Sequence, residues 1–433
     1  MTGEFQSRFF DPADPKAALT QLPQSPSVFA LYGADAHAEP YIGRTPNLRG
    51  RLERLLQPSP KHPRRLQLAS LVRRIEWRLT GSEFESLLAQ FSLLEEIYGA
   101  KALERMHLRH PAFVRFLGSN PYPRVTVPYR PSLREADWAY GPFPSRAAAE
   151  RYAEEMLKLF LLRRCTFELN PDPSYPGCVY SEMKMCLAPC YKGCSDERYA
   201  EEAAAVKSFL ATRGESRLVT LRAQRDQASA NLEFESAAAL HAQVQRVESV
   251  RALAAELVRP LSQLRAVILQ GSANPGEAAV FLFAGGQLRG PATFSTLGMR
   301  IQNEQSGSTS LFAQPMAIEP VPEEPEDREQ RTESREQAVG SEGASERGSG
   351  KASRTMLEAR LEGVLAELGA QGAPPNAAIR QGHLALLKRW YYRPEVRRTG
   401  EIFFPDAEDR WPIKAILRGV GRVAANKLKS SVS

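Results

Sequence analysis

Cysteine is scarce in this sequence, and its placement limits what it can do. The 433 residues contain five cysteines, and all of them lie between Cys165 and Cys194. A secreted protein would spread cysteines to link distant segments, so this distribution argues against a disulfide framework. Long apolar runs are also missing, because no stretch approaches the ~20 apolar residues that a membrane span needs. The opening MTGEFQSRFFDPADPK lacks the apolar core of a signal peptide, and we therefore expect a cytoplasmic, reducing location without membrane partners.

Composition indicates a folded protein with several domains and one strongly basic segment. Hydrophobic residues make up 42% of the chain, which is enough for packed cores, and the net charge is +7. At roughly 150 residues per domain, the length predicts about two to four domains. Ten basic residues lie between positions 44 and 78, against two glutamates: Arg44, Arg49, Arg51, Arg54, Lys61, Arg64, Arg65, Arg73, Arg74 and Arg78. A solvated helix face usually mixes both signs, so this imbalance favours a nucleic-acid partner.

The cysteine cluster indicates a metal or iron–sulfur site. Cys165, Cys178, Cys186 and Cys190 follow one another at intervals of thirteen, eight and four residues, and Cys194 comes four residues later. Thiolates are soft ligands that suit iron–sulfur clusters or zinc. Residues four apart can face the same point from one helical turn. The alternative is a buried pair of thiols with three spare ones.

The N-terminal part of the chain has the pattern of a small α/β unit. SVFALYG at 27–33 is an apolar, β-prone run, and Tyr41-Ile42-Gly43 is a second short strand after a segment of hairpin length. Asn47 is a suitable N-cap for the helical run LRGRLERLL that follows it. A second helix is expected over 84–98.

Helices dominate the middle of the chain. A long amphipathic helix is expected from Ser145 to about Leu162, leading into Cys165. Two further helical segments cover 196–213 and 216–258, and the second is broken near Asn231. Strands return over 264–294, where a Gly-Gly pair predicts a hairpin turn.

The last third of the chain divides into a polar segment and a helical block. Residues 303–353 are rich in Glu, Pro, Ser and Gly, so they cannot bury enough apolar surface to offset ordering, and we expect a disordered linker. In the block that follows, Trp390, Tyr391 and Tyr392 stand beside several arginines. Such aromatics either stack on unpaired bases or form a small core edged by solvated arginines.

Four features in this order resemble the UvrC/Cho family, which provides the C subunit of bacterial excinuclease ABC. SVFALYG and YIGRTPNLRGRL resemble the two halves of the GIY-YIG nuclease motif, and YGPFPSRAAAE leads into LRRC as in the family. The cysteine ladder is the third feature. LEFESAAALHAQVQRVE, at 232–248, resembles the UVR motif that the family shares with UvrB. The resemblance covers about residues 20–255, and the strands at 264–294 weakly resemble the stretch that follows UVR in UvrC.

The resemblance implies an α+β multidomain fold. Its expected parts are a small α/β GIY-YIG nuclease-like domain (24–100), a connector with the cysteine cluster (101–196), a UVR-like helical hairpin (197–258), a short β-strand segment (262–300), the linker (303–353) and a small, mainly helical C-terminal block (354–433). Full UvrC also has an RNase H-like nuclease with an acidic triad, and we recognise no such triad after the linker.

The nuclease motif can be carried over residue by residue. The resemblance makes Tyr41 the second motif tyrosine and Arg51 the helix arginine, while Arg44 stands where the family usually has lysine. Phe29 stands in place of the first motif tyrosine and lacks its hydroxyl group. Gln90 stands in place of the metal-holding glutamate, and a neutral amide is a poor ligand for a hard cation. Glu85, Glu95 or Glu96 would replace that metal-holding glutamate only if the register of the helix differs from this alignment.

The resemblance also implies partners. DNA contacts are expected from Arg44, Arg49, Arg51 and Arg54, and the ligand would be double-stranded damaged DNA. UvrB would pack its own hairpin against this one, with five apolar anchors in a helix-in-groove arrangement: Leu232, Phe234, Ala237, Ala238 and Leu240. The alternative is a helical hairpin that has no partner.

For the cysteines, the resemblance implies a [4Fe–4S] cluster on Cys165, Cys178, Cys186 and Cys190, with Cys194 as an extra thiol. Zinc is the alternative, because four thiolates also form a closed tetrahedral site.

Three functional interpretations follow. The first is an endonuclease that uses Mg²⁺ or Mn²⁺ to make one incision in damaged DNA held by UvrB. The second is a catalytically degenerate module that binds UvrB and DNA without cutting. The third is a cluster-bearing interaction protein outside repair, which the combined motifs disfavour.

Overall fold

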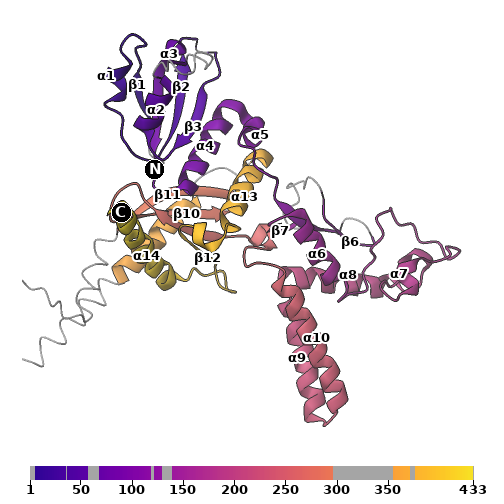
Figure 1. The fold of residues 1–433 in the computed structure, drawn as a ribbon. Helices are drawn as coiled ribbons and strands as arrows, with labels where there is room; N and C mark the ends of the chain where they lie inside the picture. The colour runs from indigo at the N-terminus through magenta and orange to yellow at the C-terminus, as the bar shows by residue number, and fades with distance from the viewer. Residues whose placement is uncertain are drawn as a thin grey trace, which may run out of the picture.

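The computed structural model describes residues 5–35, 37–56, 68–118, 121–128, 139–295, 355–370 and 376–432, and only the backbone over 427–432. The predicted linker over 303–353 lies outside the described residues, as do Lys61, Arg64 and Arg65. The described chain contains three four-stranded sheets with helices packed around them, so the expectation of a mixed α/β architecture is confirmed (Figure 1).

The first sheet belongs to the N-terminal domain and has the antiparallel order β1-β4-β2-β3. Its strands are β1 (Gln6–Phe9), β2 (Ser27–Gly33), β3 (Tyr41–Thr45) and β4 (Val72–Leu79). The helices are α1 (Pro15–Leu19), α2 (Leu48–Leu56), α3 (Leu68–Leu71) and α4 (Glu83–Tyr98). Asn47 accepts a hydrogen bond from the Gly50 backbone N–H at 2.9 Å, so the predicted cap begins α2.

Helix α4 buries two of its faces. Ala89 and Leu93 pack on one side of the first sheet, against Val28 and Ala30 of β2. On another face Phe84, Leu87, Leu88, Phe91 and Leu94 enter a larger core that contains side chains of the third sheet. Because one helix contributes to both cores, it joins the N-terminal domain to the domain at the other end of the chain.

The second sheet, in the order β6-β5-β7-β8, forms the middle of the molecule. Its strands are β5 (Ala112–Leu117), β6 (Arg124–Thr126), β7 (Ala139–Phe143) and β8 (Arg259–Pro260). The helices around it are α6 (Arg146–Leu157) and α8 (Asp196–Ala211), whereas α5 (Ala102–Arg105) packs against α4. Between α6 and α8 the cysteine-bearing segment extends away from the sheet, with α7 (Val179–Glu182) as a short helix within it (Figure 1).

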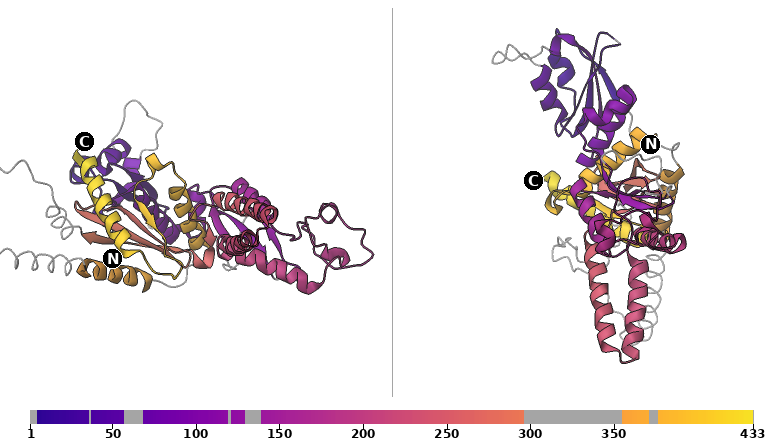
Figure 2. Two further views of the ribbon diagram at one scale, coloured as in Figure 1. Left: turned by 90° about the horizontal axis from the view of Figure 1, so that it is seen from below. Right: turned by 90° about the vertical axis from the view of Figure 1, so that its right-hand side faces the viewer.

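A helical hairpin projects from the middle domain. It consists of α9 (Glu215–Ala230) and α10 (Phe234–Ala252), which run antiparallel and extend well beyond the rest of the molecule (Figures 1 and 2). The predicted break near Asn231 is confirmed, and the turn places Leu232 at a φ of 63°. Val244, Val247 and Val250 anchor the base of α10 in the core of the middle domain.

The third sheet combines two distant parts of the sequence in the order β11-β10-β9-β12. Its strands are β9 (Ala266–Gly271), β10 (Glu277–Ala284), β11 (Gln287–Ser295) and β12 (Glu401–Phe403). A helix over 355–370, α13 (Ala377–Tyr391) and α14 (Ile413–Val432) pack around it. The β segment and the C-terminal block, treated separately in the sequence, therefore share one sheet.

The aromatic residues of the C-terminal block belong to the core of this domain. Trp390 is 2% exposed and packs with Phe84 of α4 at a ring-centroid distance of 5.3 Å. Tyr391 and Tyr392 are partly buried against the same core. The structure therefore favours the core interpretation of these aromatics over base stacking.

Candidate functional sites

The two motif tyrosine positions lie on neighbouring strands but have different environments. Phe29 pairs with Gly43 across β2 and β3, and it is 1% exposed in the core beneath α2. A Cβ atom at Gly43 would come within 2.7 Å of the Phe29 ring, so this position has no room for a side chain. Tyr41 is 40% exposed, and its ring centroid lies 6.2 Å from that of Phe29. Only the second motif position thus presents an aromatic side chain to solvent.

Arg44 is held by an ion-pair network that sequence reasoning missed. Its Nη1 lies 3.2 Å from Oε1 of Glu83, the first residue of α4. Arg393, from the C-terminal part of the chain, binds the same carboxylate through two hydrogen bonds of 2.7 and 2.8 Å. These hydrogen bonds from Arg393, together with the charges of both arginines, lower the pKa of Glu83 to about 2. No local sequence pattern reports a contact between residues so far apart.

Gln90 lies on α4, seven residues after Glu83 and therefore on the same face, about 10 Å further along the helix. It is partly buried. Glu85, a proposed substitute ligand, is 7% exposed and accepts a hydrogen bond from the Gly81 backbone N–H at 2.7 Å. Within the described ranges, no group of three or more His, Cys, Asp or Glu has the spacing of a metal site. The described residues around Gln90 thus offer no ready carboxylate set for a divalent cation.

The arginines of α2 point away from the core, because the helix buries Leu48, Leu52 and Leu56. Arg49 donates a 2.8 Å hydrogen bond from Nε to the Leu22 carbonyl, and Arg54 donates one of 2.9 Å to the Gly50 carbonyl. Arg51 is partly buried, and its side chain makes no hydrogen bond or ion pair with the part of the chain that is described. Among the described residues, the guanidinium of Arg51 thus differs from those of Arg49 and Arg54, which bond to backbone carbonyls.

The structure gathers four of the five cysteines. Burial is the main cause that raises the pKa of the Cys186 thiol to about 11, and the charges of Cys165, Cys178 and Cys190 contribute to the same shift. The three other thiols therefore lie near enough to Cys186 to act on it electrostatically. Burial raises the pKa of the Cys194 thiol, and the charge of Asp196 raises it as well. Among the cysteines, Cys190 alone contributes to this shift. These influences group Cys165, Cys178 and Cys190 with Cys186 and leave Cys194 apart, and the ligand set itself stays a prediction.

The four thiols have the donor chemistry of a soft-metal site. No three of them stand at the mutual spacing of ligands around one ion in the described structure. The Ala188 backbone N–H donates to Sγ of Cys186 at 3.3 Å, and the Arg163 guanidinium lies 3.7 Å from Sγ of Cys165. Hydrogen bonds of this kind stabilise metal-bound thiolates. The four residues therefore offer the donor atoms that an iron–sulfur cluster or zinc requires.

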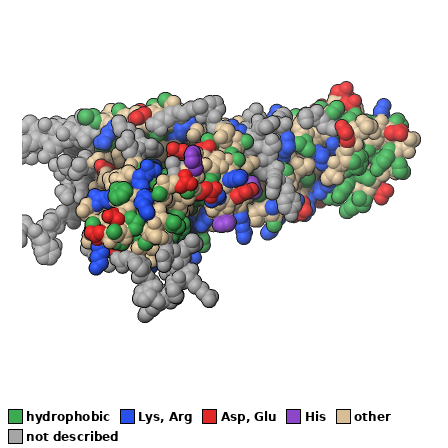
Figure 3. Space-filling model, turned by 90° about the horizontal axis from the view of Figure 1, so that it is seen from above, with side chains coloured by type: hydrophobic (Ala, Val, Ile, Leu, Met, Phe, Trp, Pro, Cys, Tyr) green, Lys and Arg blue, Asp and Glu red, His purple; other side chains and the backbone are tan. Residues whose placement is uncertain are grey.

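Apolar side chains are exposed around the cysteine segment. Phe167, Val179 and Met183 are 49%, 57% and 63% exposed, and hydrophobic side chains gather at this end of the molecule (Figure 3). Isolated exposed apolar residues are common on proteins, whereas a group of them is less so.

The helical hairpin exposes its predicted anchors at the tip. Leu232 and Phe234 are 72% and 67% exposed, although both are large and apolar. Ala238 is also exposed, while Ala237 and Leu240 are partly buried. Leu240 lines a shallow groove between α9 and α10, opposite Ala223 and Ala228. The hairpin thus presents an apolar tip with an adjoining groove.

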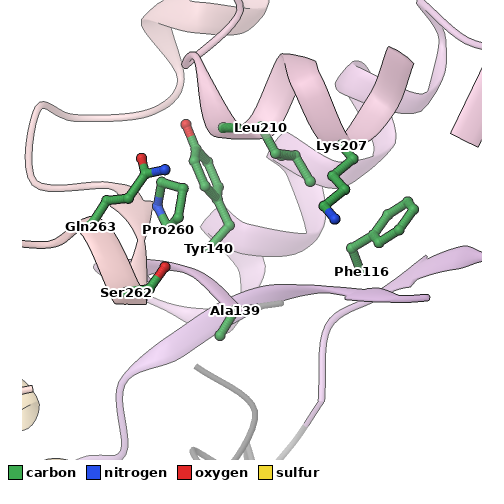
Figure 4. A pocket seen from close by; sticks show the side chains of 9 residues that line it. Phe116, Ala139, Tyr140, Lys207, Leu210, Pro260, Ser262 and Gln263 are labelled. Atoms are coloured by element: carbon green, nitrogen blue, oxygen red, sulfur yellow. The ribbon is translucent and has the colours of Figure 1, made fainter. Parts of the chain in front are cut away.

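A separate cavity of about 220 Å³ lies where β7, β8 and α8 meet (Figure 4). Tyr140, Leu210 and Pro260 form its apolar walls, and Lys207 projects toward Phe116 on the other side. It contains none of the residues that the sequence predicts for catalysis, DNA binding or ligation.

Comparison with known proteins identifies the middle of the chain. The family model for the middle domain of the UvrC/Cho excinuclease matches residues 114–209, from β5 to α8. The model for the UvrB/UvrC motif matches residues 215–250, which form the hairpin α9–α10. Residues 114–209 are thus similar to a UvrC middle domain, and residues 215–250 to a UVR motif. The sequence resemblance to the UvrC family is thereby confirmed, although neither of these models includes the nuclease-like residues 27–98.

Curated relatives agree with these matches. The chain is 29% identical over 238 residues to the UvrABC system protein C of Alcanivorax borkumensis, covering 55% of this chain and 39% of that protein. The protein of the same name from Pseudomonas protegens is 27% identical over 294 residues, covering 66% and 46%. The chain thus spans less than half the length of these UvrC relatives. No solved structure matches it significantly.

Proposed function

We propose that this UvrC-like chain is a component of nucleotide excision repair that binds damaged duplex DNA together with UvrB. The observation that carries the proposal is the UVR hairpin. The matched motif forms a projecting pair of helices, and its tip exposes Leu232 and Phe234. Large apolar side chains on a projecting element are typical of protein docking surfaces, and an amphipathic helical partner would bury them.

The proposal includes a nuclease-like centre that no longer cuts DNA. Phe29 is buried, Gln90 stands at the metal position, and Arg44 is paired with Glu83. A catalytic metal contributes several kcal/mol of transition-state stabilisation. At about 1.4 kcal/mol for each tenfold change in rate, its loss would slow incision by roughly a thousandfold. Binding through the arginines of α2 does not depend on that metal.

Incision is the second candidate function, and one observation favours it. Tyr41 is exposed on β3, and Arg44 and Arg51 keep the positive charge of two further motif positions. In this alternative Mg²⁺ or Mn²⁺ would neutralise charge on the leaving oxygen. The amide of Gln90 would then have to be supplemented by ligands from DNA or water.

The cofactor proposal is a [4Fe–4S] cluster on Cys165, Cys178, Cys186 and Cys190. It would tie the cysteine segment to the middle domain, since three ligands lie within the segment and Cys165 lies at its base. Zinc on the same thiols is the alternative. Iron, sulfide and zinc analysis of anaerobically purified protein, with a visible absorbance spectrum, distinguishes the two.

Calorimetric titration of the full chain with UvrB tests the hairpin proposal. Phe234→Asp should weaken binding at least tenfold, because it places a charge in an apolar contact. Val219→Asp is the control, since Val219 is 60% exposed on α9 of the same hairpin but lies roughly 16 Å from the tip. Equal affinity of all three proteins for UvrB would contradict the proposal.

A further inference from the structure

Arg163 occupies an unusual position beside the cysteine cluster. Its side chain is 2% exposed, and it is the only arginine that is buried among the described residues. Nε donates a 2.9 Å hydrogen bond to the Tyr122 carbonyl, and Nη1 donates one of 2.9 Å to the Phe167 carbonyl. The same Nη1 lies 3.7 Å from Sγ of Cys165.

No ion pair with another described residue compensates the charge of Arg163. Its two oxygen partners are neutral carbonyl groups, and no carboxylate of the described chain forms an ion pair with it. A guanidinium group stays protonated even in a protein interior. Removing such a charge from water is costly unless an opposite charge lies nearby. Among the residues that the structure describes, the ionisable group within hydrogen-bonding distance of its guanidinium is the thiol of Cys165.

The position of the guanidinium is fixed from several sides. The Arg163 backbone N–H donates to the Tyr199 hydroxyl at 3.2 Å, and that hydroxyl donates to the Pro123 carbonyl at 2.8 Å. Tyr199 is 1% exposed in the core of the middle domain, so this anchor does not depend on the cysteine segment. A charged group held so firmly needs little reorganisation to meet a partner.

We propose that Arg163 is a positioning residue that supplies the positive charge opposite a thiolate-ligated metal group on the four clustered cysteines. This inference rests on the proposed cofactor. Four thiolates around zinc, or around a [4Fe–4S] core, form a site of net negative charge, which provides the missing counter-charge. Hydrogen bonds and charges around the sulfur atoms tune the affinity and potential of such sites.

A purely structural role gives a different expectation. In that case Arg163 would only link the Tyr122 and Phe167 carbonyls, and its loss would destabilise the protein equally with and without metal. If Arg163 balances the charge of the metal group, the effect of its replacement on protein stability depends on whether the metal group is bound. In the metal-free protein the same residue is a buried charge without a counter-ion, so replacing it should be neutral or stabilising.

The test compares Arg163→Gln with Arg164→Gln in the full chain, in metal-loaded and metal-stripped forms. Arg164 is a matched control, because it is the adjacent arginine and donates to the Leu157 carbonyl instead of to a cysteine. We expect Arg163→Gln to release its metal or cluster to a chelator about 10- to 100-fold faster than the native chain. Its unfolding temperature should fall in the loaded form only, and Arg164→Gln should retain metal as the native chain does.

An iron–sulfur cluster provides a second measurement. The reduced cluster carries one more negative charge, so loss of Arg163 should make its reduction potential more negative. If Arg163→Gln does not fold, Arg163→Lys is compared with Arg164→Lys, and faster metal loss from the former supports the proposal.

Equal retention of metal by the two Gln variants would overturn the proposal, as would equal destabilisation of loaded and stripped Arg163→Gln. A native chain that binds neither iron nor zinc under anaerobic reconstitution would overturn it together with the cofactor proposal. Binding of UvrB by the hairpin is measured separately, so that failure would be distinguishable from failure of the repair function.

Discussion

Phe29 and Tyr41 show how single side chains divide between core and surface in the nuclease-like domain. Both positions follow from the motif in the sequence, and the burial of Phe29 follows from its place in an apolar strand. The link between Arg44, Glu83 and Arg393 was not predictable in this way. In the sequence Glu83 lies 39 positions from Arg44 and 310 positions from Arg393, and only the packing of two domains brings them together.

The ion pair at Glu83 makes stability depend on pH in a defined direction. Its folded-state pKa of about 2 lies below the ordinary value of 4.5, so the stabilisation is present above pH 4.5 and is lost as the pH falls toward 2. Because the side chain is 44% exposed, we expect Glu83→Gln to cost only about 1 kcal/mol at pH 7. Urea unfolding at pH 7 and pH 3 measures the difference.

The free energy of unfolding that Glu83→Gln costs should be smaller at pH 3 than at pH 7. Glu367→Gln, on the exposed side of the helix over 355–370, is the control and should have no effect at either pH. A cost of Glu83→Gln that stays the same at both pH values would contradict the assignment.

At the scale of elements, α4 determines how the two ends of the chain meet. The sequence predicts this helix and the hairpin α9–α10, because both have long apolar periodicity and clear caps or breaks. It does not predict the three-residue strand β12. That strand exists because it pairs with β9, with Ile402 opposite Ile268, and local sequence contains no information about so distant a partner.

Gly382 tests the contact between α13 and α4. A Cβ atom at this position would lie 1.9 Å from the Phe91 ring, so Gly382→Ala should destabilise the protein by about 1–3 kcal/mol through overpacking. Gly421→Ala in α14 is the matched control, because nothing lies within 4 Å of the added atom. It should be neutral or stabilising by up to about 1 kcal/mol. Equal unfolding free energies in urea for both variants would show that α4 and α13 do not pack closely.

At the scale of the whole molecule, the projecting parts are separate from the joined sheets. The first and third sheets meet through α4, whereas the hairpin and the cysteine segment extend from the middle domain (Figures 1 and 2). None of the described helices is both long and apolar enough to cross a membrane. The hairpin thus projects away from the N-terminal domain (Figures 1 and 2).

The helical hairpin after the cysteine segment was predictable from sequence, because it carries a local motif. That the β segment and the C-terminal block form one domain was not predictable from sequence. It depends on the pairing of strands that lie before residue 295 with a strand that lies after residue 376.

The most direct test of the account is incision of a lesion-bearing duplex preloaded with UvrB, in the presence of Mn²⁺. The native chain is compared with Arg51→Ala and Gln90→Glu. We predict that the native chain makes no more nicks than Arg51→Ala, and that Gln90→Glu gains measurable cutting because a carboxylate returns to the metal position. Nicking by the native chain that Arg51→Ala abolishes would contradict the proposal of a degenerate centre and establish the chain as an endonuclease.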